Sequence, residues 1–169
     1  LPVIAAGSLL EFALVNHSFS MPVGRIEYLF IGPVSFEEFL NASGEDRLLE
    51  LVRVYEPGHP FPQAAHTRLL ERQREYLLAG GMPEAVQRYL DTGNLDEAFQ
   101  VQASVVETFR DDFGKYARNT DLLRIHKVFD YVPLAAGDKF KYANVDPDTP
   151  ARQIRNAVDL LAKAGVINL

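Results

Sequence analysis

The chain has 169 residues, of which 47% are hydrophobic and 24% are charged, and its formal net charge is −6. This composition is ordinary for a globular protein. The chain contains no cysteine, which excludes disulfides and Cys-based zinc sites. No apolar run approaches the roughly 18 residues that a membrane-spanning helix needs. No signal peptide is visible, so the cytoplasm is the expected location.

Charge is distributed unevenly along the chain. Residues 121–169 carry seven Lys or Arg against six Asp, whereas residues 1–120 carry ten basic and 17 acidic residues. The last part is therefore relatively basic, but not basic enough to require a nucleic-acid partner. The four histidines show no spacing typical of metal ligands, and we expect no metal site from them. They are His17, His59, His66 and His126.

The first 31 residues favour two strands and one short helix. Residues 2–6 form an apolar run that predicts a buried strand. Ser8 can cap a helix over residues 9–15, with Glu11 as its capping-box partner. Residues 25–31 predict a second strand. Because natural chain ends are seldom apolar strands, we expect this sequence to be an internal piece of a longer protein.

A run of helices follows. Ser35 and Glu38 form a capping box that predicts a helix to about residue 41. Proline-rich residues 56–62 end the next helix, because proline cannot continue one. Gly80-Gly81 ends another, and Pro83 suits the first turn of its successor. The apolar spacing places these later helices at about 45–55, 63–79, 83–90 and 95–117.

The last 50 residues predict a unit of a different kind. Apolar residues at helical spacing over 122–132 end at Pro133, and residues 139–142 alternate like a short strand. Thr149 and Pro150 predict an N-cap and first-turn proline for a helix that ends near Gly165. Residues 166–167 would begin another strand. Helix, strand, helix and strand in this order predict a winged helix-turn-helix.

Five motifs in this order resemble a large prokaryotic family of P-loop ATPases of the AAA type. The resemblance covers essentially the whole chain. The motifs are Val3–Phe12 with Val23-Gly24-Arg25, Gly32–Phe39, Gly80–Val86, Asp112–Tyr116, and Lys139–Tyr142 with Ala164–Ile167.

The resemblance implies an ATPase module, then a winged helix, then a nuclease-like domain of unknown function. The chain would begin at the sensor-1 strand and end at the winged helix. The sequence contains no G-x-x-x-x-G-K-[ST], so the Walker A and B parts would lie upstream and the nuclease-like domain downstream. ATP and Mg would belong to the full-length protein. The fragment alone would bind neither and would not hydrolyse ATP.

The expected fold class is mainly α with a few short strands. The resemblance divides the chain into a remnant of the P-loop α/β ATPase core (1–44), a helical lid (45–118) and a winged-helix-like domain (119–169). Cutting the sheet of the core would expose strand edges that favour association, so a homo-oligomer is expected.

Two residues carry the predicted catalytic role. Ser8 follows a predicted strand, where ligands of open α/β sheets bind. The resemblance gives it the sensor-1 role of touching the γ-phosphate or orienting water, and the alternative is a simple helix cap. A guanidinium at Arg25 can contact phosphate in a bidentate manner. The resemblance suggests a phosphate-sensing or finger arginine there, and the alternative is a surface arginine.

Other candidates have simpler explanations. Capping accounts for Glu11 and Glu38 better than catalysis does, and residues 80–83 favour a turn in the helical lid over an anion-binding loop. Glu107, Asp111 and Asp112 favour a solvated helix face or salt bridges between domains over a metal site.

Nucleic-acid binding is the competing function. Arg152 and Arg155 lie near the start of the predicted recognition helix, and Lys139 and Lys141 flank the short strand, where cations can contact phosphate. Three aspartates nearby oppose this reading: Asp146, Asp148 and Asp159. Winged helices also dock proteins. The alternative to an ATPase fragment is therefore a DNA- or protein-binding module with a helical scaffold.

Overall fold

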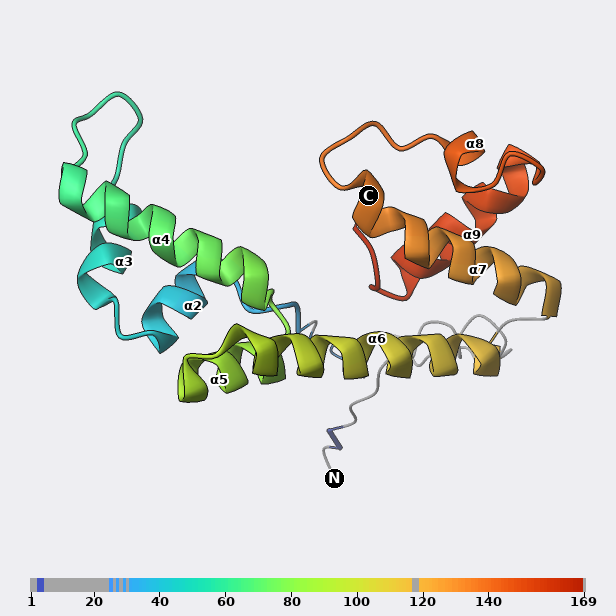
Figure 1. The fold of residues 1–169 in the computed structure, drawn as a ribbon, viewed down its shortest axis with the longest axis horizontal. Helices are drawn as coiled ribbons and strands as arrows, with labels where there is room; N and C mark the ends of the chain where they lie inside the picture. Colours follow the sequence, from blue (N-terminus) through green and yellow to red (C-terminus); the bar gives the residue numbers. More distant parts are fainter. Residues whose placement is uncertain are drawn as a thin grey trace. The chain divides into compact units, whose positions relative to one another are not determined.

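The computed structural model describes residues 3–4, 25, 27, 29, 31–116 and 119–168, and these are mainly helical (Figure 1). The mainly-α part of the predicted fold class is therefore confirmed. Within these ranges no residue belongs to a β-strand. None of the helices in them is long and apolar enough to cross a membrane.

The chain divides into two compact units: residues 28–107 form one, and residues 1–27 together with 108–169 form the other. The first, called the 28–107 unit, contains α2 (Phe36–Ala42), α3 (Asp46–Arg53), α4 (Gln63–Ala79), α5 (Pro83–Thr92) and the start of α6 (Leu95–Tyr116). In it α2 packs against both α3 and α4, and α4 packs against α5 (Figure 1). The predicted helices agree closely with these bounds, and α4 agrees at both ends.

Local capping explains where α2 begins. The backbone N–H of Ser35 donates to Glu38 Oε2 at 2.7 Å, and the backbone N–H of Glu38 donates to Ser35 Oγ at 3.3 Å. The predicted capping box is thus confirmed, and Glu38 has a structural role. Two hydrogen bonds satisfy donors that a helix start otherwise leaves to water.

The core of the 28–107 unit contains an aromatic group on α2, α4 and α5. The ring centroid of Tyr76 lies 5.5 Å from those of Phe36 and Phe39, and Tyr89 stacks on Phe39 at 6.3 Å. Phe39 is fully buried. Such aromatic pairs contribute about 0.5–1.5 kcal/mol beyond the area that they bury.

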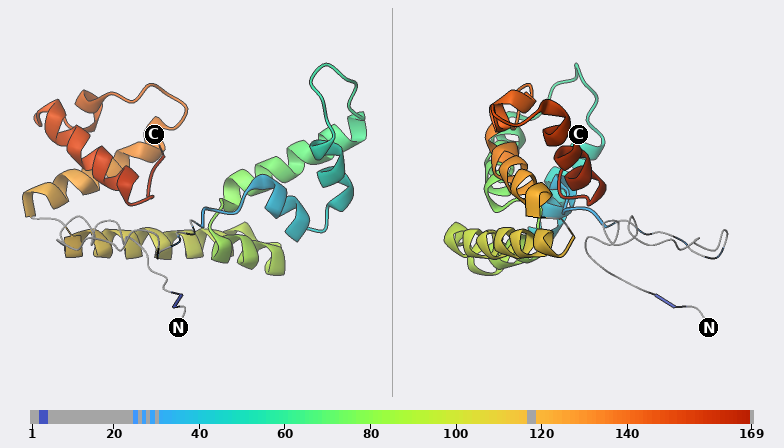
Figure 2. Two further views of the ribbon diagram at one scale, coloured as in Figure 1. Left: turned by 180° about the vertical axis from the view of Figure 1, so that it is seen from behind. Right: turned by 90° about the vertical axis from the view of Figure 1, so that its right-hand side faces the viewer.

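We call the second unit the 108–168 unit, because its described helices all lie within residues 108–168. It contains the end of α6, then α7 (Asn119–Tyr131), η1 (Val132–Ala135), α8 (Tyr142–Val145) and α9 (Ala151–Lys163). Helices α7 and α9 pack against each other, and α8 contacts both (Figure 2). Their apolar faces form a core with one residue of α6. Its buried members are Phe113, Ile125, Val128, Ile154, Ala157, Val158 and Leu161.

The end of α9 confirms the predicted glycine cap. Gly165 has φ +70°, a conformation that glycine adopts without the steric cost that a Cβ brings. Its N–H donates to the Ala162 carbonyl, and the N–H of Val166 donates to that of Leu161, each at 3.0 Å. This is the Schellman pattern, and Val166 packs on the apolar core as the pattern favours.

The start of α9 differs from the prediction. Helix α9 begins at Ala151 with Pro150 at the cap position, and the cap has no side-chain hydrogen bond. Thr149 was expected to be the N-cap, but its hydroxyl instead donates to Asp146. The Asp146 carboxylate, as a charged acceptor, takes the hydroxyl that would otherwise cap the helix.

The predicted strand over residues 139–142 is wrong, although its alternation reflects a real feature. Phe140 and Tyr142 both pack against the core of the 108–168 unit, while Lys139 and Lys141 are exposed. Lys141 has extended backbone angles, φ −122° and ψ 121°, and α8 starts immediately after it. Since no described segment pairs with this stretch, it remains irregular. A strand needs a partner for its ladder of hydrogen bonds.

The other predicted strands are not seen where the structure describes them. Val166 and Ile167 pack on the core in a bend after α9, without forming a strand. Residues 25, 27, 29 and 31 are not in a strand, and neither are Val3 and Ile4, which are 85% and 99% exposed rather than buried. The remaining residues of those two predicted strands, and the predicted helix over 9–15, lie outside the described residues.

Candidate functional site

Two of the motif segments meet in the 28–107 unit. The N–H of Val34 donates to the Gly81 carbonyl at 2.7 Å, and the Tyr76 hydroxyl donates to the Val34 carbonyl at 2.7 Å. Both main-chain polar groups of Val34 are thus bound by α4 and the turn that follows it. We call this contact the Gly81 junction, formed by Pro33, Val34, Tyr76, Gly81 and Gln102.

Gly81 allows this close approach because it has no side chain. An added Cβ would lie 2.7 Å from Pro33 Cβ and 2.9 Å from the Val34 carbonyl oxygen, closer than real Cβ atoms come. The neighbouring Gly32 differs, since a Cβ there would meet nothing within 4 Å. The glycine at position 81 is therefore required by backbone packing. This agrees with the predicted turn in the helical lid.

Helix α6 completes the junction. The Gln102 side-chain amide donates to the carbonyl of Ala79 at 2.6 Å and to that of Leu78 at 2.9 Å. These carbonyls lie at the end of α4, where acceptors have no partner within the helix. One side chain of α6 thereby holds the end of α4, beside the turn that contacts Val34.

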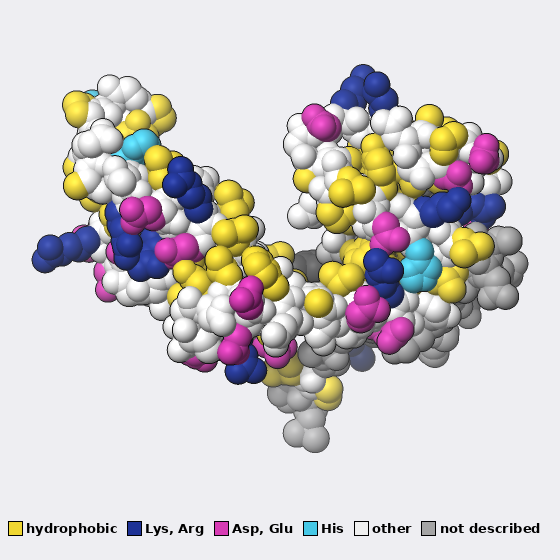
Figure 3. All heavy atoms as spheres, in the orientation of Figure 1, with side chains coloured by type: hydrophobic (Ala, Val, Ile, Leu, Met, Phe, Trp, Pro, Cys, Tyr) yellow, Lys and Arg dark blue, Asp and Glu magenta, His cyan; other side chains and the backbone are white. Residues whose placement is uncertain are grey.

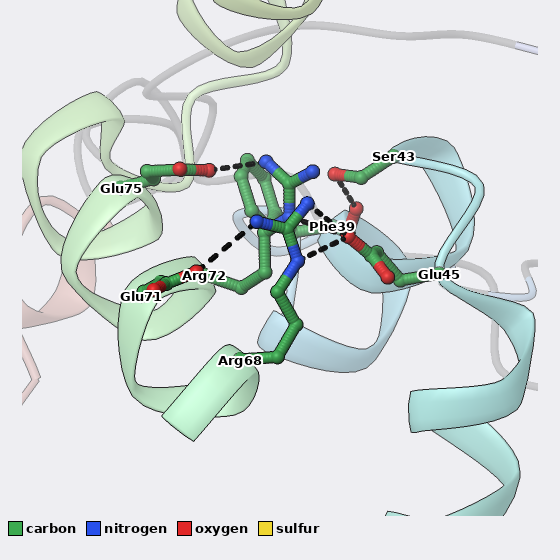
Figure 4. Close-up of polar contacts among 7 residues, drawn as sticks. All are labelled: Phe39, Ser43, Glu45, Arg68, Glu71, Arg72 and Glu75. Atoms are coloured by element: carbon green, nitrogen blue, oxygen red, sulfur yellow. Dashed lines mark hydrogen bonds and ion pairs between the residues drawn. The ribbon is translucent and has the colours of Figure 1, made fainter. Parts of the chain in front are cut away.

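An ion network joins α4 to the turn between α2 and α3 (Figure 4). Arg72 Nε donates to Glu45 Oε1 at 2.7 Å and Arg68 Nη2 lies 2.8 Å from the same oxygen. Arg72 and Arg68 also pair with Glu75 and Glu71, respectively, one turn further along α4. Figure 3 shows acidic and basic side chains gathered on this unit. Each guanidinium contacts two carboxylates, so the cluster is a structural tie between α4 and the turn before α3.

The network changes the ionisation of Glu45. The hydrogen bond from Arg72 is the largest influence and, with the bonds and charge of Arg68, holds the pKa of the Glu45 carboxyl below its ordinary value of 4.5. Partial burial of the carboxylate opposes this lowering. Glu45 is therefore charged at neutral pH and ties the turn to α4.

Of the two predicted catalytic residues, the structure describes only Arg25. Ser8 is outside the described residues. Arg25 is exposed and lies in no helix. Residues 31–35 are the continuous described segment nearest to Arg25, and this segment enters the Gly81 junction. The roles assigned to Ser8 and Arg25 stay predictions.

The predicted basic residues of α9 share its outward face. Ile154, Ala157, Val158 and Leu161 are buried, whereas Arg152, Arg155 and Asn156 are exposed on the other side of the helix. Arg155 lies 3.9 Å from Asp159 in an exposed pair. Among the residues that the structure describes, Lys139, Lys141 and Arg152 form no ion pair with one another or with any other residue.

Asp146 does not add negative charge to that face. Its carboxylate is almost buried and accepts hydrogen bonds from Lys127 Nζ of α7 and from the Thr149 hydroxyl, and Oδ1 accepts one from the Asp148 N–H at 3.3 Å. Lys127 is the main cause that holds the pKa of the Asp146 carboxyl below its ordinary value, and Thr149 adds to it. The ion pair between Asp146 and Lys127 thus ties the turn between α8 and α9 to α7.

The described residues offer no metal centre. No group of three or more His, Asp or Glu side chains among them is arranged to hold a metal ion. On α6, Asp111 is exposed, as predicted for a solvated helix face, whereas Asp112 is partly buried.

Sequence reasoning missed Tyr76 and Gln102. No local motif of the sequence includes either residue. The two adjacent glycines before Met82-Pro83 are a signal for a turn at this point. The partner segment cannot be identified from this signal, since Val34 lies 47 residues earlier.

Residues 70–169 match the family described as Domain of unknown function (DUF8612), and the chain belongs to this family. The match includes Tyr76, Gly81 and Gln102 as well as the whole 108–168 unit, and it begins after Val34. No curated protein and no solved structure matches the chain.

Proposed function

We propose that this chain supplies the helical lid and a helix-turn-helix unit to an AAA-type P-loop ATPase. The observation that carries the proposal is the Gly81 junction. It joins two segments, Gly32–Phe39 and Gly80–Val86, through which the sequence resembles that ATPase family. If the chain has the lid of that ATPase family, its motif residues should contact one another in the folded protein. The Gly81 junction is such a contact between two motifs.

On this proposal the chain senses nucleotide without holding it. Ser8 orients the attacking water or contacts the γ-phosphate, and Arg25 stabilises charge on the transferring phosphoryl group. The Walker A loop, the Walker B strand and the Mg site would then belong to another part of the protein, since the sequence contains no G-x-x-x-x-G-K-[ST]. Mg, when bound, neutralises charge on the phosphate oxygens. The chain by itself then has no ATPase activity.

The test is ATP binding and turnover by the longer protein that the proposal requires. Ser8→Ala and Arg25→Lys should keep ATP binding and lower kcat by about 10²–10³, because lysine cannot make a bidentate contact. Arg152→Ala, which removes an unpaired exposed arginine of α9, is the matched control and should leave turnover unchanged. A longer protein that neither binds nor hydrolyses ATP would refute the proposal.

A second candidate function is nucleic-acid binding by α8 and α9. The specific observation is that Asp146 is neutralised by Lys127 while Lys139, Lys141 and Arg152 remain exposed. The helical part of the predicted winged helix-turn-helix, α7, α8 and α9, supports this candidate, and the absence of a strand in residues 119–168 weighs against a wing. The visible face in Figure 3 also shows acidic side chains among the basic ones.

Fluorescence anisotropy with a labelled DNA duplex tests this second candidate. If it holds, affinity should fall as salt rises, and Arg152→Ala or Lys141→Ala should weaken binding several-fold and reduce the salt dependence by about one phosphate contact each. Lys163→Ala, at the other end of α9, is the control. Weak binding that neither variant changes would favour a protein-docking role for this unit.

A further inference from the structure

Helix α4 has an apolar stripe that the other described helices of the 28–107 unit leave exposed. Leu70 and Leu77 are 40% and 70% exposed. Together with Arg74 they follow one another at spacings of four and three residues, so all three lie on one face of the helix. Figure 3 shows hydrophobic side chains over α4 on the outside of this unit. Single exposed leucines need no partner, whereas leucines aligned on one helix face are typical of a helix–helix contact.

The charged residues of this face are incompletely paired. Arg74 is exposed and forms no ion pair within the described part of the chain. Glu71, three residues earlier, contacts Arg68 Nη1 through one carboxylate oxygen at 3.1 Å, and its side chain is 50% exposed. A carboxylate can accept from more than one donor. The face therefore combines a donor that lacks an acceptor with an acceptor that can take a second donor.

These features are complementary to a second copy of the same face. In an antiparallel pair with a two-fold axis at Gln73, Leu70 lies within one residue, about 1.5 Å along the helix, of the level of Leu77 of the second copy. Arg74 lies equally close to the level of Glu71 of the second copy. Gln73 meets its own copy, and two amides can each donate to and accept from the other. A parallel pair would instead bring like charges together.

We propose that the exposed face of α4 is the contact surface of a homodimer, in which the α4 helices of two chains pack antiparallel about a two-fold axis at Gln73. The partner is a second copy because leucines then face leucines and each Arg74 faces a Glu71. Helix α4 has 17 residues and is about 25 Å long. One such face buries less than the roughly 1,200–2,000 Å² of a standard interface, so the dimer should be weak, with a dissociation constant in the micromolar range.

Sedimentation equilibrium of the whole chain over a range of concentrations tests the proposal. The wild-type chain should pass from 18.9 kDa to twice that mass as the concentration rises. Leu77→Asp should raise the dissociation constant at least about tenfold, because it places an unpaired carboxylate in the contact. Leu123→Asp on α7, where the leucine is 66% exposed, is the matched control and should leave the constant unchanged.

An exchange of charges identifies the second copy as the partner. Arg74→Glu and Glu71→Arg each place like charges across the contact, so each variant alone should be monomeric. A mixture of the two variants restores opposite charges at both positions and should form a heterodimer with nearly the wild-type dissociation constant. Circular dichroism should show that the variants keep their helices, since every changed side chain is exposed.

Cysteine cross-linking tests the antiparallel arrangement, because the chain has no cysteine of its own. Gln73→Cys lies at the axis and should form an intermolecular disulfide on oxidation. His66→Cys, on the same face, would be about 20 Å along the helix from its own copy, too far for a disulfide. Equal cross-linking of the two variants would overturn the antiparallel pairing.

Three results would overturn the dimer itself. One is a wild-type chain that remains monomeric up to millimolar concentration. Another is a dimer that Leu77→Asp and Leu123→Asp weaken equally. The third is a mixture of the two charge variants that stays monomeric.

Discussion

The 28–107 unit and the 108–168 unit hold their helices together by different means. In the 108–168 unit, aliphatic side chains of α7 and α9 pack against Phe113. Asp146 is the one buried charged side chain among the described residues, and it pairs with Lys127. The 28–107 unit relies more on directional contacts. Hydrogen bonds at Val34 and Gln102 and the Glu45 network tie its helices, in addition to an apolar core. This core includes Phe39, Leu40, Leu48, Leu49 and Val86.

The difference matters because the two kinds of contact respond differently to change. Apolar packing loses stability in proportion to the volume removed and tolerates many replacements of similar size. A hydrogen bond to a buried backbone group is lost entirely when its donor moves, and the remaining group is then unpaired. The 28–107 unit is therefore the one whose geometry single substitutions can alter most specifically, whereas the 108–168 unit should respond mainly in stability.

The largest effect is expected from a cavity in the apolar core. Leu161 is fully buried, so Leu161→Ala should lower the free energy of unfolding of the 108–168 unit by about 2–5 kcal/mol. Leu123→Ala on α7, where the leucine is 66% exposed, is the matched control and should change it by less than about 0.5 kcal/mol. Chemical denaturation combined with hydrogen exchange assigns the loss to a unit. A loss spread equally over both units would contradict the division.

A smaller effect is expected from the ion network of the other unit. Glu45→Gln keeps the shape of the side chain and removes the charge that Arg72 and Arg68 contact, which should cost about 1–3 kcal/mol at neutral pH. Glu37→Gln is the control, because the Glu37–Arg53 pair is more than half exposed and such pairs contribute about 0–1 kcal/mol. Urea denaturation measures both variants.

The pH dependence of Glu45→Gln follows from the direction of its pKa. The pKa of Glu45 is lowered in the folded protein, so the unfolded chain binds its proton more readily. The stabilisation is present above the ordinary value of 4.5 and is lost as the pH falls below it. The difference between wild type and Glu45→Gln should therefore narrow below about pH 4. A difference that stays constant down to pH 3 would show that the charge of Glu45 contributes nothing.

Asp146→Asn should have a more local effect in the 108–168 unit. The variant weakens the ties to Lys127 and Thr149, so amides in the turn between α8 and α9 should exchange faster at neutral pH. The lowered pKa of Asp146 means that this tie is present above its ordinary value of 3.8 and is lost in more acidic solution. Asp159→Asn, which alters an exposed pair at 3.9 Å, is the control. Equal exchange in the two variants would contradict the role of Asp146.

The smallest effect is a gain in stability. Gly114 lies in α6 with no atom within 4 Å of an added Cβ, so Gly114→Ala should stabilise the protein by about 0.5–1 kcal/mol. Gly93→Ala is the contrasting variant. Gly93 has φ +67°, which strains any residue with a side chain, and the substitution should destabilise. Thermal unfolding of the two variants distinguishes a free helical glycine from one that the backbone requires.

The helices could be predicted from the sequence because their signals are local. The Ser35–Glu38 capping box, the glycine at the end of α9 and the apolar spacing along α4 each act within a few residues. The outward position of Arg152 and Arg155 follows from the same spacing. These features do not depend on contacts with residues far away in the sequence.

The strands and the Gly81 junction depended on the tertiary structure. Residues 139–142 alternate as a strand does because Phe140 and Tyr142 both reach the core, yet a strand forms only where another segment supplies hydrogen bonds, and none of the described segments does. The partner of Gly81 is Val34, which lies 47 residues earlier in the sequence. The Thr149 hydroxyl binds Asp146 and does not cap α9. By itself the sequence determined the bounds of the helices in the 28–107 unit and the end of α9. Only the tertiary structure decided which backbone and polar groups meet, because those contacts join residues that no local pattern relates.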